Sequence, residues 1–255
     1  MSKILAILLA LIMGFSTAGV TYKQNQQLRI EKEQQQIILQ QKEVERQIRQ
    51  EQLKLKFEKA EREKKQINAE NILFIGNSLA EGISYVDDKY NFITKVGISL
   101  SGLRTGGYWD RIDDYDFDTV IIIMGTNELG SYTEELFTEE YQLLINKIKA
   151  ANKDAKIILS SIPPVGNKTS YAAQFNNENV QKYNIYIKNL ATDNNLLYLD
   201  NKGYFGNVLS EEITGDGIHL TGTGYIEWLN YIKEFISDYN NSLWKEKRGF
   251  YNYQY

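Results

Sequence analysis

The 255-residue sequence predicts an α/β domain with a parallel sheet, preceded by an apolar N-terminal segment and a long helical stalk. Three observations predict this arrangement. Short apolar runs alternate with amphipathic stretches in the last two thirds of the chain, as in strands joined by crossover helices. No glycine occurs from residue 20 to residue 75, which allows one uninterrupted helix. Residues 1–68 carry 13 Lys and Arg against 8 Glu, whereas the rest carries 16 against 25 Asp and Glu.

These observations divide the chain into four parts: an apolar segment (1–22), a coiled-coil-like spacer (23–69), a folded domain (70–240) and an aromatic-rich tail (241–255). The composition excludes several classes of function. Without cysteine the chain has no disulfide, thiolate metal site or cysteine nucleophile, and with one histidine it has no multi-histidine metal site. A net charge of −4 argues against nucleic acid as a partner.

Residues 4–22 carry no charge, and their length is close to the ~20 residues that a membrane-spanning helix needs. We expect an uncleaved membrane anchor here. A secretory signal cleaved after Ala18, where small residues have the right spacing, is the alternative, and a buried soluble helix is a third. The basic residues Lys23, Arg29 and Lys32 follow the segment, so the positive-inside rule does not favour export of the rest of the chain.

The spacer is rich in Gln, Glu, Lys and Arg and has a sparse heptad pattern of apolar residues. The apolar positions of this seam are Ile30, Ile37, Val44, Ile48 and Leu55. The intervening core positions are the polar residues Gln34, Gln41 and Glu51. The pattern is compatible with a weak coiled-coil homodimer and equally with a solvated single helix held by ion pairs.

Five apolar runs in the domain predict buried strands, and three amphipathic stretches predict helices. The predicted strands are Asn71–Ile75, Phe92–Val96, Thr119–Met124, Lys156–Leu159 and Leu196–Leu199. The predicted helices are Thr133–Asn152, Asn177–Thr192 and Thr221–Asp238. Because strands alternate with crossover helices, the sheet should be parallel and covered on both faces. Functional residues should then lie at the carboxyl ends of the strands.

Four short motifs lie at such positions. Ser78 follows Gly76-Asn77 directly after the first strand, where a sharp turn would expose its hydroxyl and aim helix N–H groups at an oxyanion. The only histidine, His219, follows Asp216 by three residues, so that the carboxylate can fix its tautomer. Gly102 and Asn127 follow the second and third strands and can donate hydrogen bonds to an oxyanion. Each motif alone is more often only a turn or a cap.

Together and in this order, the motifs resemble the four blocks of the SGNH (GDSL-type) hydrolase superfamily. The matching residues are Gly76-Asn77-Ser78-Leu79, Gly102, Gly125-Thr126-Asn127 and Asp216-Gly217-Ile218-His219. The resemblance implies a flavodoxin-like three-layer α/β/α fold with strand order 2-1-3-4-5. It also implies that Ser78 is the nucleophile, His219 the base and Asp216 the residue that orients it. The implied oxyanion hole consists of the Ser78 and Gly102 N–H groups and the Asn127 amide.

Two residues depart from the usual motifs of that family. Asn77 and Glu128 stand where Asp is common, and neither is the nucleophile, the base or an oxyanion donor. We therefore expect a serine esterase that needs no metal or cofactor. The expected substrate is a small acyl group, such as acetyl, on cell-envelope or extracellular carbohydrate. The segment after Pro163-Pro164 should form part of the substrate rim through Asn167 and Tyr171.

Taken together, the appendages and the resemblance predict a membrane protein with an extracellular catalytic domain, or a secreted protein if residues 1–18 are removed. Two other functions stay open from the sequence. One is a lipase or lysophospholipase type of acylhydrolase. The other is a membrane-tethered coiled-coil scaffold whose hydrolase domain is inactive, although the chain has all four catalytic residue types.

Overall fold

The computed structural model describes residues 22, 25–52, 54–55, 66–167 and 173–251, with side chains described up to residue 242. The chain divides into two compact units, Met1–Glu63 and Lys64–Tyr255. In the first unit residues 25–52 and 54–55 are helical, as the stalk prediction requires. The heptad-spaced side chains of Ile30, Ile37 and Val44 are about half exposed in the single chain (53%, 53% and 54%). Pairing of two stalks stays a prediction.

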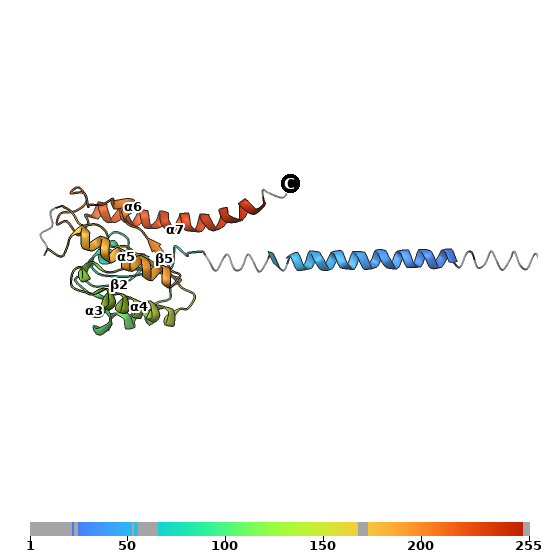
Figure 1. Ribbon diagram of the computed structural model, residues 1–255, viewed down its shortest axis with the longest axis horizontal. Helices are drawn as coiled ribbons and strands as arrows, with labels where there is room; N and C mark the ends of the chain where they lie inside the picture. Colours follow the sequence, from blue (N-terminus) through green and yellow to red (C-terminus); the bar gives the residue numbers. More distant parts are fainter. Residues whose placement is uncertain (1–21, 23–24, 53, 56–65, 168–172, 252–255) are drawn as a thin grey trace, which may run out of the picture. The chain divides into compact units, whose positions relative to one another are not determined.

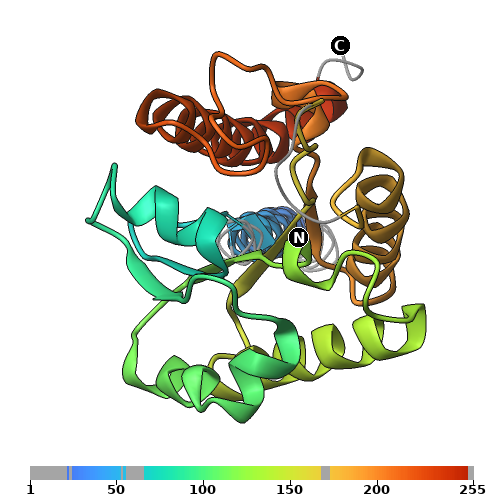
Figure 2. The ribbon, with the colours of Figure 1, turned by 90° about the vertical axis from the view of Figure 1, so that its left-hand side faces the viewer.

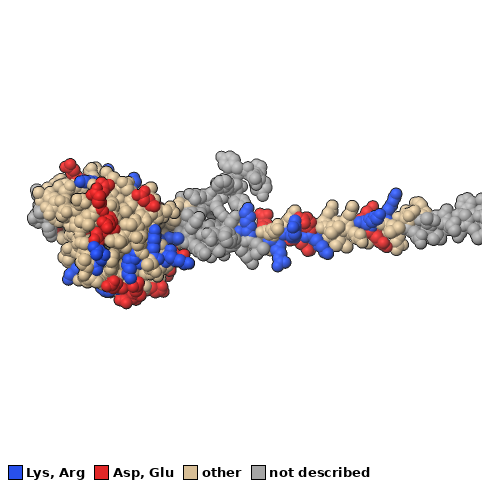
Figure 3. All heavy atoms as spheres, turned by 60° about the horizontal axis from the view of Figure 1, so that its bottom comes forward, with Lys and Arg blue, Asp and Glu red and all other residues tan. Residues whose placement is uncertain are grey.

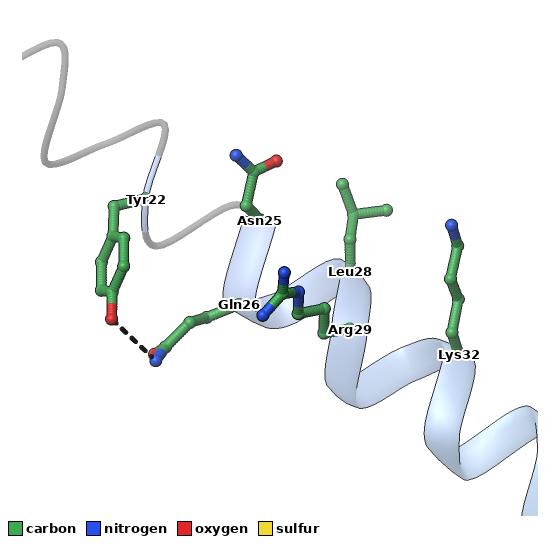
Figure 4. A pocket seen from close by; sticks show the side chains of 6 residues that line it. All are labelled: Tyr22, Asn25, Gln26, Leu28, Arg29 and Lys32. Carbon is green, nitrogen blue, oxygen red and sulfur yellow. Dashed lines mark hydrogen bonds between the residues drawn. The ribbon is translucent and has the colours of Figure 1, made fainter.

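Six side chains on the first part of the stalk line an open surface pocket (Figure 4). Within it, the amide Nε2 of Gln26 donates a hydrogen bond to the Tyr22 hydroxyl, one helical turn away, at 3.3 Å. Apart from Tyr22, the predicted anchor at residues 4–22 lies outside the described residues. Among the helices that the structure does describe, none has an apolar stretch long enough to cross a bilayer.

The second unit contains a five-stranded, entirely parallel sheet of order β2-β1-β3-β4-β5, which confirms the expected strand order. The strands are β1 (Ile72–Gly76), β2 (Asn91–Thr94), β3 (Thr119–Ile123), β4 (Lys156–Ser160) and β5 (Leu197–Leu199). Each lies within about one residue of a predicted strand, apart from the far end of β2. Of the three inner strands, β1 and β3 are buried along their whole length, which explains their continuous apolar sequence.

Alternate side chains of the strands point to two separate apolar cores. Leu73 and Ile75 pack into one core, and Ile72 and Phe74 into the other. Helices α3 (Leu100–Thr105), α4 (Glu134–Ala151) and α5 (Asn177–Asp193) cover the first face. Helices α2 (Ser78–Ser84), α6 (Lys202–Phe205) and α7 (Gly222–Tyr251) cover the second. Figures 1 and 2 show the resulting three layers, with α4 and α7 on opposite sides of the sheet.

The helices α4 and α5 begin and end close to where the sequence predicts. The Thr133 hydroxyl caps α4 by accepting from the Leu136 N–H, and Glu134 and Glu135 occupy the first turn, where the helix dipole favours acids. One difference concerns α7, which continues to Tyr251 instead of ending near Asp238. No proline follows residue 238 to stop it, so the predicted tail is largely helical.

The described residues of this unit also form the 3₁₀ helices η1 (Tyr108–Asp114) and η2 (Thr126–Glu128). On the face that Figure 3 shows, acidic and basic side chains lie among each other, and neither sign dominates.

The chain enters the second unit at the amino-terminal edge of the sheet. Ile67 is buried there, and the Asn240 side chain of α7 pairs with both its N–H and its C=O, at 2.8 and 3.0 Å. The Asn68 amide donates to the Asp118 carboxylate, just before β3, at 2.7 Å. The predicted boundary at residue 69 therefore falls inside a segment that packs on the domain.

Candidate active site

Ser78 is the first residue of α2 and directly follows the turn after β1. The Asn77 side chain caps this helix by accepting from the Leu79 N–H at 3.0 Å, as an aspartate would. Its own amide nitrogen is buried and has no partner among the described residues. A Cβ at Gly76 would lie 2.4 Å from the Ala80 Cβ and 2.6 Å from the Ile123 oxygen, so only glycine permits this close turn.

His219 lies in a tight loop before α7. An isolated bridge between Thr214 and Leu220 closes the loop, and the buried Thr214 hydroxyl donates to the His219 C=O at 2.6 Å. At the turn, one carboxylate oxygen of Asp216 accepts from the backbone N–H groups of Ile218 and His219, at 2.9 and 2.8 Å. The spacing of three residues thus folds the carboxylate back onto the histidine.

The structure brings together the three residues that the sequence predicts to be catalytic. His219 Nε2 lies 2.9 Å from the Ser78 Oγ, and Nδ1 lies 2.7 Å from the second oxygen of Asp216. Burial opposes ionisation of Asp216, but the hydrogen bonds from the side chain and backbone of His219 and from the Ile218 N–H outweigh it and lower its pKa to about 2. An ionised carboxylate can only accept, so the ring proton lies on Nδ1, and Nε2 is left to accept from Ser78.

Asn127 and Glu128 both contact the segment that leads into α3. The Asn127 side-chain amide donates to the Ile98 C=O at 2.8 Å. The carboxylate of Glu128, which is fully buried, accepts from the Leu100 N–H at 2.6 Å. Adjacent residues after β3 therefore hold the chain on either side of Ser99, which caps α3.

Gly102 lies in the first turn of α3, and its N–H donates to the capping hydroxyl of Ser99 at 3.2 Å. That bond is long for an N–H···O contact, and an oxyanion would be a stronger acceptor than a hydroxyl. The oxyanion role of Gly102 stays a prediction, because this structure shows its N–H engaged in the helix cap.

The segment after β4 is held by side chains of α5. Asn184 pairs with both the N–H and the C=O of Ile162, at 2.7 and 3.0 Å, and Asn177 does the same with Val165, at 2.8 and 2.9 Å. Asn167 follows this segment and is exposed. The second rim residue that the sequence suggests, Tyr171, lies outside the described residues.

Sequence reasoning missed the residues that support the catalytic ones. Thr214 could have been found from its position two residues before Asp216, in a loop that must turn sharply. In the sequence Glu128 is visible only as a departure from a motif, because its contact with Leu100 spans 28 positions. Among the described residues no group of three or more His, Asp or Glu side chains is placed to hold a metal ion.

Solved structures show the same fold. A GDSL-like lipase from Bacteroides thetaiotaomicron is 22% identical with a TM-score of 0.55, covering 66% of this chain and 88% of its own. A proposed acylhydrolase from Bacteroides fragilis is 20% identical with a TM-score of 0.55, covering 69% and 91%. A proposed platelet activating factor from Streptococcus pneumonia is 22% identical with a TM-score of 0.55, covering 71% and 91%. No curated protein sequence matches the chain.

These distant similarities show the fold but not the family, which a family model identifies. The GDSL-like lipase/acylhydrolase family matches residues 74–225, which is more than half of the chain. The match begins within β1 and ends in the first turn of α7, and so contains Ser78, Asn127, Asp216 and His219. The chain therefore belongs to the GDSL-like lipase/acylhydrolase family and is a hydrolase of ester bonds.

Proposed function

We propose that the protein is a serine esterase in which Ser78, His219 and Asp216 act as a catalytic triad. The observation that carries this proposal is the continuous chain of hydrogen bonds from Ser78 Oγ through both ring nitrogens of His219 to Asp216. In this arrangement the imidazole can take the serine proton, and the adjacent carboxylate stabilises the imidazolium that results.

The reaction proceeds in two steps. As Ser78 Oγ bonds to the ester carbonyl carbon, its proton moves to His219 Nε2 and a tetrahedral oxyanion forms. The bond to the alcohol oxygen then breaks, and the alcohol leaves with the proton from His219. In the second step His219 takes a proton from water as the water attacks the acyl-enzyme, and returns it to Ser78 Oγ when the acid leaves.

The oxyanion is held by the Ser78 N–H, the Asn127 amide and the N–H of Gly102. A side-chain amide carries two N–H groups, so Asn127 can keep its bond to the Ile98 C=O and offer the second N–H to the substrate. For Gly102 the oxyanion takes the place of the Ser99 hydroxyl, its present acceptor. These donors stabilise the charge that develops only in the transition state.

The proposed substrate is a small acyl group, such as acetyl, carried by cell-envelope or extracellular carbohydrate. Its support is the polar rim expected beyond β4, where Asn167 is exposed, and the apolar segment with a helical stalk that precedes the domain. The proposed location is the outer face of a cell membrane, held by residues 4–22. Cleavage after Ala18 would instead release the protein.

The triad is tested by labelling the full chain with a fluorophosphonate, which reacts with activated serines, and by measuring turnover of a small aryl acetate. Ser78→Ala should abolish labelling, and Ser78→Ala or His219→Ala should lower kcat by at least 10³-fold, with little further loss in the double variant. Ser84→Ala is a matched control in the same helix, because its hydroxyl only donates to the Glu81 C=O. Near-normal activity of either single variant would remove the mechanism.

The substrate is tested separately with acetylated glycans and with esters of increasing acyl length. We expect the highest kcat/KM for acetyl esters of carbohydrate. A preference for long acyl chains on a phospholipid or glyceride would contradict the carbohydrate proposal and leave the triad mechanism intact.

A further inference from the structure

Glu128 is a carboxylate in a place where the solvent does not reach it. It closes η2, directly after Asn127, and its side chain is 0% exposed. Burial raises the pKa of this carboxyl to about 7, although the hydrogen bond from the Leu100 N–H lowers it. Placing an ionisable group here has a cost in stability, which an apolar residue would avoid. A glutamate at this position therefore needs an explanation.

The two carboxylate oxygens have different surroundings. One accepts from the Leu100 N–H at 2.6 Å, and the other has no hydrogen-bond partner among the described residues. The Tyr141 hydroxyl from α4 is likewise buried and unpartnered, and its pKa is raised by burial and by the charge of Glu128. The backbone N–H groups of Gly125 and of Glu128 itself also lower the pKa of the Glu128 carboxyl, but both belong to the same short turn. The bond from the Leu100 N–H is therefore the one that joins this carboxyl to the first residue of α3.

The held segment contributes to the proposed oxyanion hole. Ser99 caps α3, and Gly102, a proposed donor, lies in the same turn. From the neighbouring position Asn127, the proposed side-chain donor, binds the Ile98 C=O. The side chains of Asn127 and Glu128 bind the chain on both sides of Ser99. These two bonds fix the distance between the two proposed oxyanion donors, the Asn127 amide and the Gly102 N–H.

We propose that Glu128 is a positioning residue of the oxyanion hole, whose buried carboxyl fixes the first turn of α3 relative to Asn127 through the Leu100 N–H. The inference rests on the proposed serine esterase mechanism. It assigns no chemical step to Glu128, which touches neither the substrate nor the triad. What the bond requires is an acceptor oxygen, and both a carboxylate and a neutral carboxyl provide one.

The test compares three variants of the full chain on a small aryl acetate. Glu128→Met keeps an unbranched side chain but removes the acceptor, and should lower kcat about 10- to 100-fold with KM changed less than twofold. A displacement of about 1 Å in the site is enough for such a loss. Glu128→Gln keeps an acceptor oxygen and should retain kcat within about threefold. If Glu128 had only a structural role, Glu128→Met would reduce the amount of folded protein without lowering kcat at nearly constant KM.

The matched control is Glu140→Ala. Glu140 is also buried and also holds α3, but it does so through the Arg104 side chain near the other end of the helix. It should retain kcat within about threefold. A kcat loss as large as that of Glu128→Met would show that any weakening of α3 suffices, and would overturn the assignment to Glu128.

Two other outcomes would overturn the inference: unchanged kcat in Glu128→Met, or equal losses in Glu128→Gln and Glu128→Met. If Glu128→Met does not fold, amide hydrogen exchange of Leu100 in the wild type and in Glu128→Gln decides. Protection in both supports the proposal, and rapid exchange in either contradicts it. Wild-type labelling at Ser78 is measured first, so that failure of the esterase mechanism is recognised separately.

Discussion

The backbone N–H of Gly166 donates to the C=O of Gly217 at 2.7 Å, so the segment after β4 directly supports the loop that carries Asp216 and His219. A Cβ built at residue 166 would lie only 3.0 Å from the Gly217 Cα, and Gly217 itself has a positive φ of 84°. The neighbouring Val165 is in turn held by Asn177. A backbone contact between two glycines therefore supports the loop that positions His219, the proposed base.

Gly166→Ala should lower kcat on a small ester about tenfold, because the added methyl group would lie 3.0 Å from the Gly217 Cα and the 216–219 loop must shift to make room for it. The measurement is steady-state kinetics together with thermal unfolding. Gly215→Ala is the control in the same loop, since a Cβ there meets nothing within 4 Å and the residue does not have positive φ. If both variants retain full kcat, the glycine contact does not position the base.

Asn127→Ala should lower kcat by roughly 10²- to 10³-fold with little change in KM, the size of loss seen when an oxyanion donor is removed. Asn127→Asp keeps the shape of the side chain but has no N–H to donate, and should lose as much. Kinetics on a small ester measure both. An Asn127→Asp variant with normal kcat would return Asn127 to a structural role at the Ile98 C=O.

Glu128 should make stability depend on pH. Its pKa is raised from 4.5 to about 7 by burial, so between these values the unfolded chain releases a proton that the folded chain keeps. The free energy of unfolding therefore falls as pH rises from 4.5 to 7, by at most about 3 kcal/mol, and this contribution is constant above pH 7. Denaturant unfolding at pH 5 and pH 8 should show a smaller difference in Glu128→Gln than in the wild type. Equal differences would contradict the raised pKa.

Two truncations test where the catalytic domain begins. A chain of residues 66–255 should retain kcat, because Ser78 follows the carboxyl end of β1, His219 contacts it there, and the chain enters at the opposite edge of the sheet. A chain of residues 69–255 loses the buried Ile67 and its two hydrogen bonds to Asn240, and should be less stable by about 3 kcal/mol. Thermal unfolding compares the two. Equal stability would place the domain boundary at residue 69, as the sequence suggests.

The fold was predictable because its determinants are local. A parallel strand buried on both faces must be a continuous apolar run, and β1 and β3 are such runs. The helix α4 has a capping threonine, acids in its first turn and an apolar stripe, all of which are visible in its own sequence. By contrast, η1 follows two glycines and has no periodic apolar pattern, so nothing local indicated it.

The site was only partly predictable, for a related reason. Ser78 and the Asp216–His219 pair belong to short motifs whose geometry is fixed within a few residues. The contact of Glu128 with Leu100 joins positions 28 residues apart, and that of Gly166 with Gly217 joins positions still further apart. Such contacts arise from the packing of crossover segments, and no periodicity in the chain encodes them.

The side chains of Asn177 and Asn184 pair with backbone N–H and C=O groups of the segment after β4, as the backbone of a neighbouring strand would. Pro163 and Pro164 have no N–H, and the flanking residues Ile162 and Val165 have all their backbone hydrogen-bonding groups supplied by α5. Together with the bonds from the Leu209 N–H to the Val165 C=O and from the Gly166 N–H to the Gly217 C=O, these contacts fix the path of the segment. Substitutions after Asn167 should therefore leave these bonds in place, so the proposed substrate rim can vary in sequence without loss of the proposed triad.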